Sequence, residues 1–331
     1  MTDNSRIRVV VGMSGGVDSS VCAYLLKRQG YDVVGVFMKN WDEKKDSGVC
    51  TVTEDYQDVA KVANEIGIPY YSVNFEKEYW DGVFTYFLDE YRHGRTPNPC
   101  IACNKYLKFD ALLKKALAMG IDYVATGHYA KIEKGEDGKY ILRASEAVKK
   151  DQSYVLYNFT QEQLAHTLMP LGGYNKDWVR QKAEELGLGV AHKPDSQEIC
   201  FVEDDDYAKF ITDYSGYKPK EGDILDVNGN VIGKHRGLIY YTIGQRKGIG
   251  AYGRPMFVMK IDAENNTITL GEKGMEFSNE LTAYDVNFVS GEFPKENMLI
   301  TAKVRYQAPP AAAMLCPQKD GTVKLMFPEP Q

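Results

Sequence analysis

The sequence has few cysteines, no long apolar run and no excess of basic residues, and each shortage excludes a class of protein. Six cysteines in 331 residues are too sparse for a small secreted domain held by disulfides. Apolar runs such as residues 8–13 and 32–38 are far shorter than the roughly 20 residues that cross a bilayer. The N-terminus also lacks the pattern of a secretory signal. We therefore expect a cytoplasmic protein with no membrane segment.

The charge balance limits how this protein can meet a nucleic acid. The formal net charge is −6 at pH 7, which argues against indiscriminate binding to a phosphate backbone. A nucleic-acid partner would need a local basic surface. Basic positions in the C-terminal half that are candidates to follow phosphates are Lys234, His235, Arg236, Arg246, Lys247, Arg254 and Arg305.

The first half of the chain alternates short β-rich runs with amphipathic stretches. The expected strands are Arg8–Val11, Asp32–Met38, Tyr70–Val73 and Tyr123–Ala125. The expected helices are Ser19–Gln29, Thr53–Ile66, Glu76–Tyr91 and Lys105–Met119. Such a β-α-β-α series predicts the α/β class with a doubly wound parallel sheet, and places ligands beyond the carboxyl ends of the strands.

The length and the later pattern indicate three domains. Residues 1–159 form the predicted catalytic domain, and residues 160–218 a small central domain with helices at Lys176–Leu186 and Asp204–Tyr214. From residue 219 to residue 331, turn signals recur between short alternating strands, which predicts an antiparallel β-barrel or sandwich.

A glycine-rich loop, GMSGGVDSS, lies between the first expected strand and the first expected helix. Successive backbone N–H groups and the following helix N-terminus form an anion site. The loop lacks the lysine of a Walker motif, and Asp18 in its place suits a Mg²⁺ held against pyrophosphate. The plainer alternative is a glycine turn that merely starts a helix. The form SGGxDS resembles the PP-loop ATP pyrophosphatases, which implies a HUP-like fold, transfer of AMP and release of pyrophosphate.

Two separated cysteines lie in polar segments. Cys103 follows the segment Arg95–Pro99, which we expect to be a stiff exposed turn, and we place Cys103 near the start of the next helix, where its thiolate is stabilised. Cys200 lies in the segment DSQEICF. An activated carbonyl needs a sulfur nucleophile, and a persulfide supplies one whose terminal sulfur a second thiolate can release.

Seven stretches, in order, closely resemble the tRNA-specific 2-thiouridylases. They are GMSGGVDSS, RTPNPCIACNKYLKFD, ATGHYA, KDQSYVL, DSQEICFV, YYTIGQRKG and VRYQ. The resemblance implies an enzyme that uses ATP and Mg²⁺ to adenylate C2 of the wobble uridine in tRNAs for Lys, Glu and Gln. It also implies sulfur transfer to that carbon, giving 2-thiouridine, and a sulfur donor protein, either a cysteine desulfurase or a relay protein.

The same resemblance assigns roles by position. Cys103 corresponds to the nucleophilic thiol and Cys200 to the persulfide carrier, and the two would form a transient disulfide after transfer. The implied ATP contacts are Gly12, Met13, Ser14, Gly15, Gly16, Val17, Asp18, Ser19, Met38 and Gly127. The implied target-base contacts are Asn98, Pro99 and Cys100. The implied tRNA contacts are His128, Lys150, Asp151, Gln152, Arg305 and Tyr306.

Two features depart from the family pattern. Many members carry Asp at position 100, so the role of that position at the target base is in doubt here. Cys100, Cys103 and Cys200 are also candidate ligands of a [4Fe-4S] cluster that would deliver sulfide in place of a persulfide. A structural zinc is disfavoured because no fourth ligand is identified. Members usually continue past VRYQ with a Pro-Gly-Gln motif and a final strand, so we expect the last barrel strands to be missing.

Two other functions remain open. A PP-loop ligase acting on a small molecule would leave Cys103 and Cys200 without a role. A non-catalytic, nucleotide-dependent tRNA-binding protein would bind tRNA without turning over ATP, and the intact SGGVDS loop disfavours it. Ordinary packing is expected for Cys22 on the apolar face of the first helix. Ordinary surface or packing roles are also expected for Cys50, Cys316, His93 and His166.

Overall fold

The computed structural model describes residues 3–41, 51–195, 199–202, 206–275 and 277–331. Contacts divide the chain into two compact units, which we describe separately. The first unit comprises residues 1–83, 100–197 and 287–292, and the second comprises residues 84–99, 198–286 and 293–331. Cys50 and the Ser196–Glu198 part of the predicted Cys200 segment lie outside the described residues. The predicted central segment 160–218 is divided between the two units.

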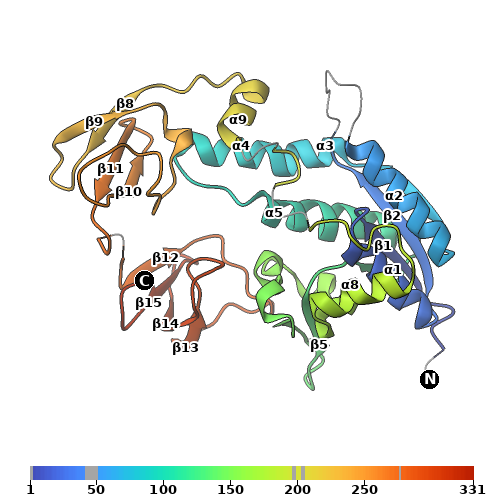
Figure 1. Cartoon of the computed structure of the whole chain (residues 1–331). Coiled ribbons are helices and arrows are strands. Elements are labelled where there is room, and N and C mark those ends of the chain that lie inside the picture. The colour runs from blue at the N-terminus through green and yellow to red at the C-terminus, as the bar shows by residue number, and fades with distance from the viewer. Residues whose placement is uncertain (1–2, 42–50, 196–198, 203–205, 276) are drawn as a thin grey trace. The chain divides into compact units, whose positions relative to one another are not determined.

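The first unit is built on a five-stranded sheet in the order β3-β2-β1-β4-β7, in which every neighbouring pair is parallel. Its strands are β1 (Arg8–Met13), β2 (Asp32–Lys39), β3 (Tyr70–Asn74), β4 (Tyr123–Ala125) and β7 (Thr167–Leu168). Two of its principal helices, α1 (Val17–Arg28) and α2 (Thr51–Ile66), lie beside β1 and β2 in Figure 1. The predicted doubly wound parallel sheet is confirmed.

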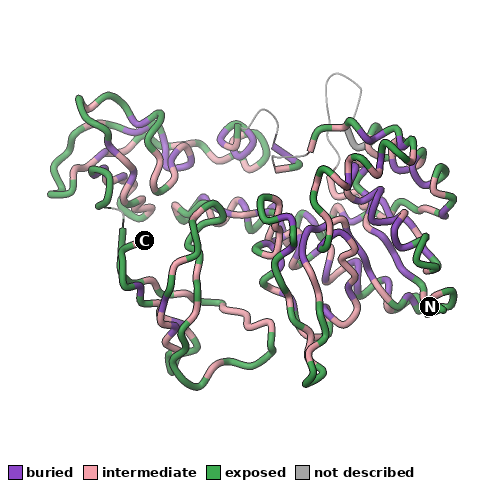
Figure 2. The backbone as a smooth tube through the Cα atoms, turned by 60° about the horizontal axis from the view of Figure 1, so that its bottom comes forward, coloured by how far each residue is buried: buried purple, intermediate pink, exposed green. Residues whose placement is uncertain are grey.

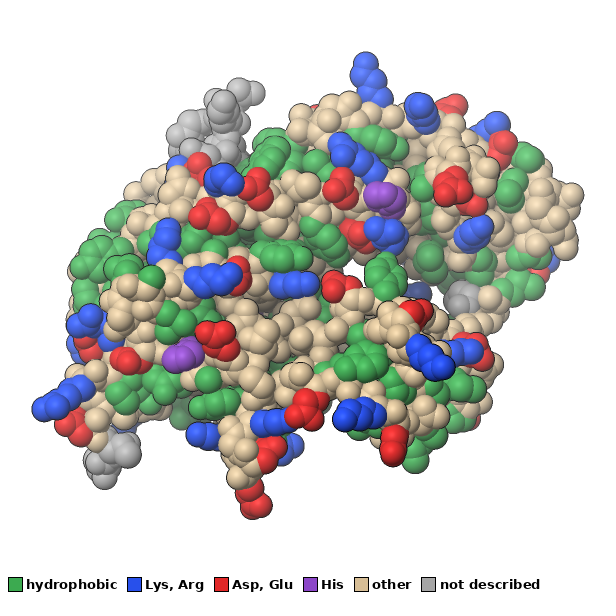
Figure 3. Space-filling view, turned by 180° about the vertical axis from the view of Figure 1, so that it is seen from behind, with side chains coloured by type: hydrophobic (Ala, Val, Ile, Leu, Met, Phe, Trp, Pro, Cys, Tyr) green, Lys and Arg blue, Asp and Glu red, His purple; other side chains and the backbone are tan. Residues whose placement is uncertain are grey.

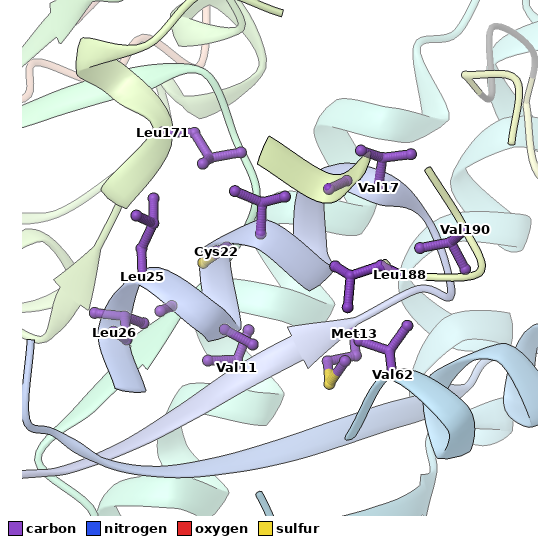
Figure 4. Close-up of a cluster of buried hydrophobic side chains, with 14 of the residues drawn as sticks. Val11, Met13, Val17, Cys22, Leu25, Leu26, Val62, Leu171, Leu188 and Val190 are labelled. Atoms are coloured by element: carbon purple, nitrogen blue, oxygen red, sulfur yellow. The ribbon is translucent and has the colours of Figure 1, made fainter. Parts of the chain in front are cut away.

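Continuous burial of the central strand explains the apolar runs of the sequence. Val9, Val11 and Met13 pack in one cluster with α1, α2 and α8 (Lys176–Glu185), as the close-up shows for Val11 and Met13 (Figure 4). Val10, whose side chain points to the opposite face, is also only 3% exposed. Both faces of the sheet are therefore covered, as expected for parallel strands. Figure 2 shows buried segments concentrated in these elements.

Two predicted helices have different bounds from those the sequence indicated. The helix expected at Lys105–Met119 begins six residues earlier, as α5 (Pro99–Ala102), a π-helical segment η2 (Cys103–Ala111) and α6 (Leu112–Ala118). The helix expected at Glu76–Tyr91 comprises α3 (Glu76–Tyr79), the π-helical segment η1 (Trp80–Phe84) and α4 (Thr85–Arg92). Gly82 allows the two to approach closely, because a Cβ there would lie 3.0 Å from Cβ of Tyr106.

Several small elements of the first unit were not predicted. They are the hairpin of β5 (Ala130–Lys134) and β6 (Tyr140–Ala144), the helix α7 (Gln161–Ala165), and the 3₁₀ turns η3 (Val148–Lys150), η4 (Ser153–Leu156) and η5 (Pro170–Gly173). The strand β7 has only two residues, too few for a period to show in the sequence. Side chains of β5, β6, η4 and α7 form a second apolar cluster with Phe109 and Phe159.

The second unit contains, among its described residues, two four-stranded sheets in the region where the sequence predicted an antiparallel β-barrel or sandwich. The first, ordered β10-β11-β8-β9, consists of β8 (Gly222–Leu225), β9 (Val231–His235), β10 (Phe257–Asp262) and β11 (Thr267–Gly271). The second, ordered β12-β15-β14-β13, consists of β12 (Glu280–Ala283), β13 (Met298–Ala302), β14 (Ala311–Pro317) and β15 (Val323–Met326). The pairing is antiparallel except between β8 and β11, which are parallel. A 3₁₀ turn, η6 (Leu238–Tyr240), follows β9.

The helices of the second unit pack through aromatic side chains. Phe87 of α4 packs edge to face on Phe201, with 5.2 Å between the ring centroids. The ring centroid of Phe210, in α9 (Tyr207–Ser215), lies 4.9 Å from that of Phe201. The helix expected at Asp204–Tyr214 is therefore present with slightly shifted bounds. Within the described ranges, none of the helices is long and apolar enough to span a bilayer.

Two adjacent glycines give a matched test of how the turn η5 packs against the hairpin strand β5 within the first unit. A Cβ at Gly172 would lie 2.1 Å from the Ala130 carbonyl oxygen, whereas a Cβ at Gly173 would have no atom within 4 Å. We expect Gly172→Ala to lower the free energy of unfolding by about 1–3 kcal/mol through overpacking. Gly173→Ala should change it by less than about 0.5 kcal/mol. Equal effects in urea unfolding would contradict this packing.

Candidate nucleotide and sulfur-transfer site

The glycine-rich loop lies where the strand order of the sheet reverses. The strand β1 pairs with β2 on one side and with β4 on the other, and the chain moves in opposite directions across the sheet from this point. The carboxyl ends of β1 and β4 are Met13 and Ala125. Ligands of doubly wound sheets bind in the crevice at such a point. The predicted position of the loop is therefore that of a ligand site.

Backbone geometry shapes this loop for an anion. Gly15 has φ +71°, and a Cβ there would lie 2.7 Å from the Asp55 carbonyl oxygen, so only glycine fits. The Ser14 N–H donates to Ser19 Oγ at 3.2 Å, which closes the loop on itself. Gly16 is the N-cap of α1, and no described side chain caps that helix. The first N–H groups of α1 can therefore donate hydrogen bonds to phosphate oxygens.

The other predicted ATP contacts lie beside the loop. A Cβ on Gly12 would be 3.8 Å from the Met38 methyl carbon, so Met38 lies against the base of the loop. A Cβ on Gly127 would be 2.7 Å from the Asp18 carbonyl carbon and 2.8 Å from the Ser19 nitrogen. The segment after β4 thus touches the loop backbone, and Gly127 is required for that approach. The structure brings these three sequence-predicted positions together.

Asp18 is the centre of a charged network in the first unit. Its carboxylate accepts a hydrogen bond from the Tyr129 hydroxyl at 2.8 Å and an ion pair from Lys176 Nζ at 2.7 Å. The pKa of the Tyr129 hydroxyl is raised by burial and by the Asp18 charge, so the phenol remains a donor. Asp18 is a hard oxygen ligand, one-third exposed beside the loop, and these properties fit Mg²⁺.

The network extends from Lys176 to Asp195. Asp195 accepts ion pairs from Lys176 at 2.8 Å, Arg180 at 2.7 Å and Lys150 at 2.8 Å. Burial opposes ionisation of Asp195, but the hydrogen bonds from Lys150 and Lys176 outweigh it and hold the pKa of this carboxyl well below its usual range. Lys193, two residues earlier, pairs with Asp55 and Asp58 of α2. The chain before the Cys200 segment is therefore anchored beside the loop.

The predicted tRNA contacts of the first unit have internal partners. His128 is 8% exposed and shares a hydrogen bond of 2.7 Å with the Thr126 hydroxyl. Burial, with a smaller effect of Lys108, holds the pKa of His128 well below its usual value, so its imidazole is neutral. Gln152 exchanges hydrogen bonds with the Tyr129 backbone, and the Ser145 N–H donates to Asp151. Their assignment to tRNA stays a prediction.

The predicted surroundings of Cys103 need correction. Pro97 and Pro99 are buried rather than exposed, and the helix begins at Pro99, where proline is favoured because it has no N–H to leave unbonded. Cys100 therefore lies in the first turn and is exposed, whereas Cys103 is half-buried one turn later. The helix N-terminus consequently acts on Cys100 more directly than on Cys103.

Cys200 belongs to the second unit and is exposed. The next residue, Phe201, is 3% exposed in the aromatic cluster with Phe87 and Phe210. This anchor fixes the chain on the carboxyl side of Cys200, while the ion pairs of Asp195 fix it five residues earlier in the first unit. Cys22, in contrast, is fully buried and its pKa is raised, chiefly by burial, which confirms its packing role.

The described residues contain no group of three or more His, Cys, Asp or Glu side chains that could hold a metal ion. Cys100 and Cys103 belong to the first unit and Cys200 to the second, so the iron–sulfur alternative stays a prediction. We derive no step through it.

Basic side chains of the second unit differ in what they can offer to tRNA. A Cβ on Gly244 would lie 2.9 Å from the Arg305 guanidinium, so Arg305 packs over the turn that carries Arg246 and Lys247, and all three are exposed. The prediction for His235 is wrong, because its ring is 1% exposed and bonded to the Asn266 carbonyl oxygen. On the face in Figure 3, basic and acidic side chains are interspersed.

Three members of the charged network were missed by sequence reasoning as functional residues, namely Tyr129, Lys176 and Arg180. Lys176 and Asp18 are separated by 158 positions, so no local motif links them. A usable signal was the lysine at the first position of α8, directly after the N-cap Asn175. Cations are disfavoured at that end of a helix, which hints at a role outside the helix.

A separate cavity of about 300 Å³ lies at the amino ends of the parallel strands. Its lining includes Tyr31, which precedes β2, and Tyr123 and Thr167, which begin β4 and β7. These are the amino ends of parallel strands, opposite the loop. The cavity is therefore distinct from the candidate nucleotide site.

Family models match three consecutive parts of the chain. They are described as a tRNA methyl transferase HUP domain at residues 7–204, a tRNA methyl transferase PRC-barrel domain at 208–272 and an aminomethyltransferase beta-barrel domain at 278–331. The chain is similar to the "tRNA-specific 2-thiouridylase MnmA" of Clostridioides difficile, with 54% identity over 98% of this chain and 91% of the relative. The protein of the same name from Acetivibrio thermocellus is 53% identical over 99% of this chain and 93% of the relative.

Solved structures resemble the chain more distantly. One is a 4-thiouridine synthetase–RNA complex with bound ATP, 18% identical, with a TM-score of 0.37 over 59% of this chain and 45% of that chain. A likeness of this size supports no statement about activity.

The close approach at Gly127 can be tested on nucleotide binding. We expect Gly127→Ala to displace the Asp18–Ser19 backbone and to weaken MgATP binding by roughly 10- to 100-fold, the equivalent of an overpacking strain of 1–3 kcal/mol. Gly189→Ala is the control, because a Cβ there has no atom within 4 Å. Calorimetric titration measures both. Unchanged affinity in Gly127→Ala would show that the loop does not hold the nucleotide.

Proposed function

The chain belongs to the family of tRNA-specific 2-thiouridylases, and we propose that it adenylates C2 of the wobble uridine of tRNA and replaces the C2 oxygen with sulfur. The observation that carries the proposal is the glycine-rich loop before the uncapped start of α1, where Gly127 approaches the Asp18–Ser19 backbone and Met38 lies against Gly12. This arrangement suits ATP, whose phosphates need N–H donors and whose ribose and base need an apolar neighbour. The family model that matches residues 7–204 is described as a methyl transferase domain, but the relatives that match nearly the whole chain are named 2-thiouridylases.

In the first step, the uridine O2 attacks the α-phosphorus of ATP, the bond to the β-phosphate oxygen breaks, and pyrophosphate leaves. The loop N–H groups bind phosphate oxygens and hold the α-phosphorus in place. Mg²⁺, when bound at Asp18, would neutralise charge on the leaving pyrophosphate. Tyr129 keeps the Asp18 carboxylate oriented through its 2.8 Å hydrogen bond. The product is a uridine whose C2 oxygen carries AMP and is ready to leave.

In the second step, the terminal sulfur of a Cys200 persulfide attacks C2, and AMP departs with the former uridine oxygen. The Cys103 thiolate then attacks Sγ of Cys200. The S–S bond to the nucleoside breaks, its electron pair stays on the sulfur bound to C2, and 2-thiouridine is released. Cys103 and Cys200 are left as a disulfide, which an external thiol must reduce before the next cycle. Because the two cysteines belong to different units, the proposal requires the units to bring the two sulfur atoms together.

The target base is proposed to bind beside Asn98, Pro99 and Cys100. Cys100 stands where many relatives have Asp, and its exposure in the first helical turn supports a contact with the base. A uridine must leave its stack to reach such a site. The persulfide route is the one we propose.

The partners follow from the same chemistry. We propose tRNAs for Lys, Glu and Gln as substrates, with phosphate contacts from Lys150, Arg305 and Tyr306. The sulfur on Cys200 is proposed to come from a cysteine desulfurase or a relay protein, which an exposed thiol can meet. A tRNA substrate supports a cytoplasmic site of action.

Substitution of the two cysteines separates the steps. In Cys200→Ser, tRNA-dependent release of pyrophosphate should persist while 2-thiouridine falls below detection, because activation needs no thiol. In Cys103→Ser, the sulfur should remain attached, giving a covalent adduct of tRNA and Cys200 that a thiol reductant releases. Cys316→Ser, at a half-buried site in β14 of the second unit, is the control and should retain activity. Formation of 2-thiouridine by Cys200→Ser would contradict sulfur transfer from a Cys200 persulfide.

Arg305 provides a test of tRNA contact. We expect Arg305→Ala to weaken tRNA binding and to reduce the slope of log affinity against log salt by about 0.7 to 1, as for the loss of one phosphate contact. Lys260→Ala removes another exposed cation of the second unit, one already paired with Asp262 at 3.0 Å, and should leave the slope unchanged. Identical slopes for wild type and Arg305→Ala would exclude Arg305 as a phosphate ligand.

A further inference from the structure

The nucleotide loop contains no cation of its own. From Gly12 to Ser20 the only charged residue is Asp18, which is negative. ATP and pyrophosphate are highly charged anions, and loop N–H groups supply only partial charges. A metal ion would offset part of the anionic charge, and Asp18 is the carboxylate of the loop that would hold it. The site therefore lacks a fixed positive group within its own sequence motif.

Lys176 brings a cation to this place from a distant part of the chain. Its Nζ lies 2.7 Å and 2.8 Å from the two carboxylate oxygens of Asp18, and its side chain is only 12% exposed. The Asn175 side chain, not Lys176, caps α8 by accepting from the Trp178 N–H. The helix dipole opposes a lysine at this position. The ion pairs of Lys176 with Asp18 and Asp195 offset this unfavourable interaction with the helix dipole.

Packing fixes where Lys176 can reach. Val179 and Ala183 of α8 are fully buried in the same cluster as Val21 and Leu25 of α1. The start of α8 is therefore held against α1, the helix whose N-terminus forms the anion site. A flexible four-carbon side chain on a fixed helix can change its partner by an ångström or two without moving the backbone.

The remaining pairs of Asp195 permit such a change. Arg180 at 2.7 Å and Lys150 at 2.8 Å stay with Asp195 if Lys176 turns away. Asp18 would in turn hold Mg²⁺ when a nucleotide is bound. Neither carboxylate is then left without a cation, which would be costly at a partly buried position.

We propose that Lys176 is a phosphate ligand of the nucleotide site, binding the pyrophosphate portion of ATP in place of the lysine that the loop lacks. In the absence of nucleotide, Asp18 and Asp195 hold its ammonium group beside the loop. On binding, the ammonium donates to the β- and γ-phosphate oxygens and remains with pyrophosphate after the α–β bond breaks. The inference rests on the proposed function only in that ATP binds at this loop.

The test compares ligands with and without the pyrophosphate portion. Calorimetric titration of Lys176→Met should give roughly 10- to 100-fold weaker binding of MgATP and Mg-pyrophosphate, the range for hydrogen bonds to charged groups. Binding of AMP, which keeps adenine, ribose and the α-phosphate, should be unchanged. Lys182→Met is the matched control on the same helix, because Lys182 pairs with Glu185 and does not reach the loop.

A structural role would give a different pattern. If Lys176 only stabilised the fold, Lys176→Met would weaken AMP and MgATP binding equally, and that result overturns the proposal. Lys176→Arg keeps the charge and should recover most of the pyrophosphate affinity, which covers the case in which the methionine variant folds poorly. If the wild type binds MgATP, and Lys176→Met binds Mg-pyrophosphate as tightly as the wild type does, the inference about Lys176 is wrong while the proposed function stands. Wild type that binds neither ligand would remove the proposed function as well.

Discussion

The Asp18 carboxylate lies beside the candidate anion site, and the charged network of the first unit is arranged around it. A negative side chain beside a phosphate loop is unfavourable unless cations surround it. In the first unit those cations are Lys176 directly, and Arg180 and Lys150 through Asp195. The network also ties α8 to α1 and the start of the Cys200 segment to the loop. Asp195, five residues before the proposed sulfur carrier Cys200, therefore shares the ion pair of Lys176 with Asp18 of the proposed nucleotide site.

The two units contribute different parts of the proposed reaction. The first supplies the loop, Met38, Gly127 and the half-buried Cys103, and the second supplies the exposed Cys200 and the basic turn beneath Arg305. A reaction that adenylates an RNA base and then delivers sulfur must bring these parts to one carbon atom. An exposed carrier thiol on one unit suits this need, because it can first meet a sulfur donor and afterwards meet the base.

The fold and the loop were predictable from local sequence, whereas the network was not. Buried apolar runs and amphipathic periods predicted the parallel sheet, and the position of the glycine loop between strand and helix predicted where the candidate nucleotide site lies. The start of the α5 helix was misjudged because Pro97 and Pro99 suggested a turn, although Pro99 occupies the first helical position. The pairing of Lys176 with Asp18 spans 158 positions, and only tertiary structure creates it. His235 was misread for the same reason, since its burial depends on Asn266 from another strand connection.

The most direct test of the central claim follows the oxygen atom. An anticodon stem-loop carrying ¹⁸O at C2 of the wobble uridine, incubated with the protein, ATP, Mg²⁺ and a persulfide source, would be analysed by mass spectrometry of its AMP and nucleosides. Adenylation of O2 predicts ¹⁸O in AMP in equal amount to the 2-thiouridine formed. Unlabelled AMP accompanying 2-thiouridine would contradict activation of the base, and so the account given of this site.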